Sequence, residues 1–237
     1  REYIDSLPPI TLPTSDPTLH PIDAWIQQGL QRNAIEPSGP IDDLRFLRRL
    51  YLDTVGVPPS LEEIETFLSV PQGQRRPDAI DRVLGDPRWA DHWVSYWQDV
   101  LAENPGLLKP ELNNTGPFRY WIYESFRDNK AMDRFATELI RMEGSRLGGG
   151  PAGFAMASQN DVPMAAKGVV LTQAFLGVNM TCARCHDSPD RISSQKDLFS
   201  IAALLERRPI ALPETSTVPA RSDGTFPNIP VSLSPGD

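Results

Sequence analysis

The chain has 237 residues, of which 40% are hydrophobic and 23% charged, a composition typical of a globular protein with one sizeable core. Its 31 acidic and 23 basic residues give a formal net charge of −8, and the absence of a basic block argues against nucleic acid or an anionic membrane surface as a partner. No run of the sequence approaches the roughly 20 apolar residues that a membrane-spanning helix needs.

The first part of the chain predicts an extended arm followed by helices. Residues 1–20 contain four prolines and little periodicity, so we expect an arm or a linker there. Apolar residues then recur at helical spacing. This pattern predicts helices at about residues 23–33, 41–55, 61–70, 77–84 and 88–102. Ser60 and Glu63 have the spacing of an N-terminal capping box for the third helix.

The second part of the chain predicts further helices and no convincing strand. After a loop at residues 104–115, helical patterns cover about residues 117–128, 132–142, 163–180 and 195–206, and the glycine-rich stretch 148–153 is expected to be irregular. From residue 209 onward the chain is rich in proline and serine. The sequence therefore predicts an all-α, multi-helix domain over residues 21–208, with an extended arm at 1–20 and a tail or linker at 209–237.

The chemistry of the chain is concentrated in one short motif. Its two cysteines lie in Cys182-Ala183-Arg184-Cys185, and His186 follows directly. Cys-x-x-Cys-His is the signature of c-type heme attachment. Two thiols on one helical turn form thioether bonds with two vinyl groups at one porphyrin edge, and the adjacent imidazole ligates the iron. A zinc site would need four ligands, and a thioredoxin-like pair would follow a strand. The motif therefore predicts one covalent heme c, held by Cys182, Cys185 and His186.

The second axial position of this heme is less constrained. No Met or His follows His186, so a distal ligand comes from upstream or from another chain, or the iron is open or bound by water. The leading candidate is His92, which lies one turn before Tyr96 in the aromatic helix. His20 in the proline-rich arm and Met156 in the irregular segment are the alternatives.

The motif and the patterns around it resemble the planctomycete-type cytochrome c domain, over about residues 21–208. The similar stretches are residues 22–26, 47–59, 86–89, 92–97, 133–135 and 175–187, the last of which contains the Cys-x-x-Cys-His motif. The resemblance implies export from the cytoplasm, a covalent heme and frequent fusion to other domains. Many relatives carry a histidine at the position of Tyr96, whereas here His92 stands one turn earlier.

Three functions are compatible with these features. The favoured one is a mono-heme, extracytoplasmic electron-transfer cytochrome that works between a partner oxidoreductase, or a fused downstream domain, and a respiratory carrier. The alternative is a heme enzyme, peroxidase- or oxidase-like, with an open iron site lined by Tyr96, Arg184 or Asp187. The third is a structural module that its heme holds together. The sequence leaves enzyme activity and oligomeric state open.

Overall fold

The structure, a computed structural model, describes residues 20–101, 116–145, 149–157, 163–189 and 193–231. Apart from His20, the predicted N-terminal arm lies outside these residues, and so does the predicted loop at 104–115. The chain divides into two compact units, residues 1–46 and 47–237, and the division falls within a helix. Each unit is described by itself.

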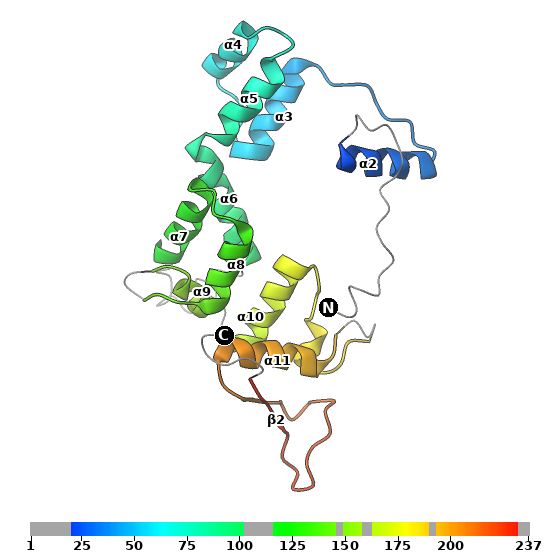
Figure 1. The fold of residues 1–237 in the computed structure, drawn as a ribbon, viewed down its shortest axis with the longest axis vertical. Coiled ribbons are helices and arrows are strands. Elements are labelled where there is room, and N and C mark those ends of the chain that lie inside the picture. Colours follow the sequence, from blue (N-terminus) through cyan, green and yellow to red (C-terminus); the bar gives the residue numbers. More distant parts are fainter. Residues whose placement is uncertain (1–19, 102–115, 146–148, 158–162, 190–192, 232–237) are drawn as a thin grey trace. The chain divides into compact units, whose positions relative to one another are not determined.

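The described residues are mostly helical, as the apolar periodicity predicted (Figure 1). The α-helices are α2 (Pro21–Arg32), α3 (Asp43–Val55), α4 (Leu61–Ser69), α5 (Arg75–Leu84), α6 (Pro87–Val100), α7 (Gly116–Arg127), α8 (Met132–Arg141), α9 (Ala152–Ala157), α10 (Pro163–Leu171) and α11 (Gln195–Glu206). Among these, α9 was not predicted. None of the described helices is both long enough and apolar enough to cross a membrane.

The first unit holds α2 and the start of α3. His20 is the N-cap of α2, and its Nδ1 accepts a hydrogen bond of 3.3 Å from the backbone N–H of Ile22. This interaction gives His20 a structural role in starting the helix.

The N-terminal part of the second unit is tied together at the start of α6. The predicted capping box of α4 is confirmed, since Ser60 and Glu63 exchange hydrogen bonds of 2.7 and 3.2 Å. The guanidinium of Arg88 pairs with the carboxylates of Glu63 and Asp86 at 2.5 and 2.6 Å. It also lies 5.9 Å from the ring centre of the buried Tyr51 on α3. One arginine therefore links α3, α4 and α6.

Aromatic packing joins α6 to the segment that precedes the cysteine motif. Trp97 on α6 stacks on Phe175 with ring centres 5.8 Å apart, and it meets Phe135 of α8 edge to face at 5.2 Å. Trp97 and Phe175 pack against a core cluster of buried residues from several helices, to which Phe135 belongs. Its largest members include Phe118, Phe135, Phe154, Ile122 and Leu139.

The long helix predicted at 163–180 is shorter in the structure. α10 ends at Leu171 and continues as a π-helical turn, η3 (Thr172–Leu176). Gly177 then takes a left-handed conformation with φ +66°, and its N–H donates to the carbonyl of Thr172. The cysteine motif therefore does not close this helix but forms a turn of its own, η4 (Cys182–Arg184).

The segment after α11 folds back on that helix. Strands β1 (Ile210–Ala211) and β2 (Asn228–Ile229) pair in antiparallel register, with Ile210 opposite Ile229. Leu212 and Ile229 are buried in a second core cluster, together with Leu198 and Phe199 of α11. The sequence predicted no strand here, because two-residue strands have no readable periodicity, and it did not reveal that this proline-rich segment buries apolar side chains.

Candidate functional site

The cysteine motif is a single, well-defined turn. Asn179 Oδ1 accepts hydrogen bonds from the N–H and hydroxyl of Thr181, at 2.9 and 2.6 Å, and so starts the turn. The carbonyl of Cys182 accepts from the N–H groups of Cys185 and His186, at 3.2 and 3.1 Å. The two thiols and the imidazole therefore project from one turn, as the spacing predicted.

The three candidate heme-binding side chains of this turn are all accessible. Cys182 and Cys185 are free cysteines, and both are exposed, as is His186. Ala183, which follows Cys182, is fully buried against α11. Burial of this one methyl group fixes the turn to the core while the reactive groups face outward.

The hydrogen bond of His186 determines its tautomer. Its Nδ1 lies 2.8 Å from the backbone carbonyl oxygen of Asp187. A carbonyl oxygen only accepts, so Nδ1 carries the proton and the lone pair of the neutral ring lies on Nε2. This is the arrangement by which a protein orients an imidazole that binds a metal through Nε2.

The start of α11 anchors the turn. Asp187 Oδ1 accepts a hydrogen bond of 2.8 Å from the backbone N–H of Gln195. The side chain of Gln195 is fully buried, and its Nε2 donates to the carbonyl of Arg184 over 3.5 Å. The sequence analysis did not single out Gln195, because nothing in its local pattern distinguishes it from any other first residue of a helix.

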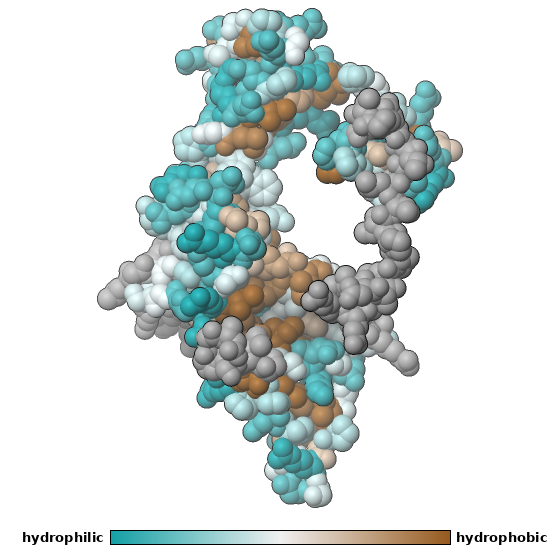
Figure 2. Space-filling view, viewed as in Figure 1, coloured by the Kyte–Doolittle hydropathy of each residue, from teal (hydrophilic) through white to brown (hydrophobic). Residues whose placement is uncertain are grey.

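These residues fit a c-type heme. The donor set consists of two free, exposed thiols on one turn and an imidazole with a free Nε2, which is what thioether attachment and iron ligation require. Leu176, close before the turn, is 69% exposed, and Figure 2 shows apolar surface over α10. A zinc ion fits less well, since no group of three or more His, Cys, Asp or Glu residues comes together in the described part of the chain.

The structure places His92 on the exposed side of α6, against the turn that ends α3. A Cβ added to Gly56 would lie 2.3 Å from His92 Nδ1, so the ring packs directly on this glycine. The ring centre of His92 is also 5.7 Å from that of Trp93. Its role as distal iron ligand stays a prediction.

A cavity of about 520 Å³ lies between α6 and the α10–η3 segment. Tyr96, 54% exposed, lines it from α6 together with the stacked Trp97. Gln173 and Ala174 line it from η3, whose π-helical geometry no sequence pattern indicated. Of the residues named for a heme enzyme, Tyr96 borders this cavity, while Arg184 and Asp187 belong to the cysteine turn.

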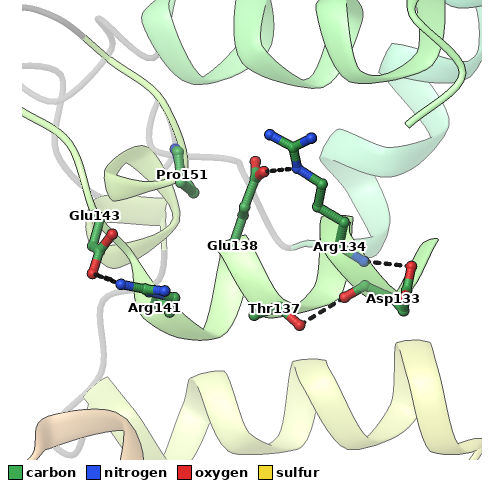
Figure 3. A pocket seen from close by; sticks show the side chains of 7 residues that line it. All are labelled: Asp133, Arg134, Thr137, Glu138, Arg141, Glu143 and Pro151. Carbon is green, nitrogen blue, oxygen red and sulfur yellow. Dashed lines mark hydrogen bonds and ion pairs between the residues drawn. The ribbon is translucent and has the colours of Figure 1, made fainter. Parts of the chain in front are cut away.

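A second cavity of about 520 Å³ borders α8 and is lined by charged residues that pair with one another (Figure 3). Glu138 accepts hydrogen bonds from Lys130, Arg134 and Trp121 at 2.6, 2.8 and 3.1 Å. Burial opposes its ionisation, but these hydrogen bonds outweigh burial and hold the pKa of Glu138 below its usual value. The carboxylate therefore serves the packing of α7 on α8.

Comparison with known proteins identifies a family but no individual relative. Neither the curated proteins nor the solved structures include a significant match to this chain. The model of one family, PSCyt2, described as a protein of unknown function (DUF1549), matches residues 21–209, which include the cysteine turn and α11. The chain therefore belongs to the PSCyt2 family, a planctomycete cytochrome-type domain whose function is unknown.

Proposed function

We propose that this chain is a mono-heme c-type cytochrome module that transfers electrons outside the cytoplasm. Cys182 and Cys185 attach the heme, and His186 ligates its iron through Nε2. Such a heme takes up and releases one electron at a time. A partner oxidoreductase, or a domain fused downstream, donates the electron, and a respiratory carrier accepts it.

The observation that carries the proposal is the position of His186 beside the two thiols and its hydrogen bond to the backbone. The imidazole shares one turn with two free, exposed thiols, and its Nδ1 donates to the carbonyl of Asp187. This hydrogen bond holds the ring orientation and raises the basicity of Nε2 as a ligand. The family supports the same conclusion, since it is cytochrome-type.

The charge of the chain bears on its partner. The net charge of −8 favours a redox partner with a cationic surface, and salt weakens an attraction between exposed charges over distances beyond about 10 Å at 0.1 M. We therefore expect electron transfer to such a partner to slow as ionic strength rises.

Heme attachment is tested by the mass of the intact protein. The chain is produced in a host that matures c-type cytochromes, and we expect it to gain the mass of one heme that resists denaturation and acid extraction. The double variant Cys182→Ala, Cys185→Ala has lost both thiols and gains none. A wild-type chain without the adduct, in cells that mature a control cytochrome c, contradicts the proposal.

The distal side is tested by optical spectroscopy of the same protein. With His92 as the second ligand, the ferric protein is low-spin and its spectrum is insensitive to cyanide, whereas His92→Ala makes it high-spin and cyanide-binding. His20→Ala is the matched control, since His20 caps α2, and leaves the spectrum unchanged. A wild-type protein that readily binds cyanide or carbon monoxide favours the heme-enzyme alternative.

A further inference from the structure

Gln195 is a buried polar residue with more partners than its position at the start of a helix requires. Its side chain is fully buried. Its Oε1 accepts hydrogen bonds from the hydroxyl of Ser216 and the N–H of Thr217, at 2.5 and 3.0 Å. Its Nε2 donates to the carbonyl of Arg184. A buried amide without such partners would be destabilising, so these contacts fix the side chain in one orientation.

The partners of Gln195 lie on both sides of the iron-binding residue. The side chain of Gln195 bonds to Arg184, and its backbone N–H bonds to Asp187. These two partners flank the pair Cys185–His186. Asp187 is also the residue whose carbonyl holds His186 Nδ1. Gln195 is thus connected to the imidazole through the two ends of the short segment that carries it.

The other partners belong to a different part of the chain. Ser216 and Thr217 follow β1, in the segment that packs on α11 through Leu212 and Ile229. This segment lies beyond residues 21–209, the part that the family model matches. The side chain of Gln195 therefore joins the cysteine turn of the family domain to a segment outside it.

We propose that Gln195 is a positioning residue, which uses the segment of residues 210–229 to hold the cysteine turn and, through it, the imidazole of His186. The part of this inference that concerns the heme rests on the proposed function. The part that concerns the turn does not, because the contacts form between residues of the chain itself.

The first test measures hydrogen exchange in the full chain as purified. The N–H groups of Cys185 and His186 are bonded to the carbonyl of Cys182, so their exchange reports opening of the turn. Gln195→Met keeps the length of the side chain but removes its polar atoms. We expect exchange at these two amides, relative to the amide of Ala202 in the middle of α11, to become about five- to tenfold faster.

Two further variants make this result specific. Leu205→Ala removes a buried side chain of α11 that belongs to the other core cluster, so it lowers stability but should not raise the exchange ratio. Ser216→Ala removes one donor to Oε1 of Gln195 and should raise the exchange ratio by a smaller factor. If Gln195→Met does not fold, this variant alone tests whether Gln195 holds the turn. An unchanged ratio in Gln195→Met, or in Ser216→Ala alone when the former is unfolded, overturns the proposal.

The second test uses the protein with heme attached. Gln195→Met is expected to gain the same heme mass as wild type but to show a shifted reduction potential and altered ferric bands, while Leu205→Ala shows neither. An unchanged potential in Gln195→Met would overturn the link to the imidazole. If wild type gains no heme, the proposed function fails, and the exchange ratio still decides whether Gln195 holds the turn.

Discussion

Lys167 is a buried charged residue whose desolvation lowers stability, and the local sequence does not reveal this burial. It lies on α10, is fully buried, and places its ammonium 5.6 Å from the ring centre of Phe154. Burial lowers the pKa of Lys167 to about 8, although the nearby carboxylate of Glu206 acts in the opposite direction. In the sequence, Lys167 reads as an ordinary polar position of a helix.

This pKa predicts a pH dependence of stability. An unfolded lysine titrates near 10.4, so the unfolded chain binds more protons than the folded one between about pH 8 and that value, and stability rises across this window. We expect Lys167→Met to lose this rise, which is at most about 3 kcal/mol. Urea unfolding at pH 8 and pH 10 measures it.

The matched control for Lys167 is Lys196→Met, because Lys196 is exposed on α11. This variant keeps Lys167 and every other titrating group except Lys196, so its stability should still rise between pH 8 and pH 10. If wild type and Lys167→Met respond identically to pH, the ammonium of Lys167 is not desolvated as the structure describes.

At the scale of elements, the contact between the end of α3 and α6 rests on a glycine. Gly56 has φ +77°, in the left-handed region that side chains disfavour, and His92 packs on its Cα face. The sequence predicted a helix stop at this position. The sequence did not predict that His92, the candidate iron ligand, packs on Gly56, because this contact depends on how α3 and α6 pack together.

Gly56→Ala is therefore expected to destabilise the protein by about 1–3 kcal/mol, from backbone strain and from the clash with His92. His92→Ala removes the clash but not the strain, so the double variant should recover part of the loss. Denaturant unfolding of the four proteins of this cycle measures the coupling.

Gly73→Ala is the control for this cycle, since nothing lies within 4 Å of a Cβ added at Gly73. It should leave stability nearly unchanged. Strictly additive effects of the Gly56 and His92 substitutions would show that the ring of His92 does not rest on Gly56.

The end of α10 shows a limit of reading helices from apolar periodicity. The apolar pattern runs on towards Met180, whereas in the structure the α-helix ends at Leu171 and η3 ends at Leu176, with Gly177 as its C-cap. Phe175 of η3 stacks on Trp97 of α6. The π-helical turn and this long-range stacking occur together, and neither has a local signal in the sequence.

At the scale of the molecule, the described part of the second unit has two apolar clusters, and α10 and α11 contribute residues to both. Met164 and Ile201 pack against both of them. The second cluster includes Leu212 and Ile229, so the segment after the family domain completes the core that supports the cysteine turn. The Pro- and Ser-rich composition of this segment predicted a tail or linker. Composition alone does not show that a few apolar residues of the segment pack against α11.

The sequence by itself determined the helical class and most helix positions, because apolar spacing and capping residues act within a few residues of each other. It also predicted Cys182, Cys185 and His186 as the candidate heme-binding residues, since heme attachment requires those side chains at that local spacing. Only the tertiary structure decided which backbone carbonyl and hydroxyl surround the buried amide of Gln195, and the place of His92 against Gly56. Each of these depends on which backbone carbonyl, buried amide or glycine lies next to the side chain in space, and chain folding, not local pattern, sets those neighbours.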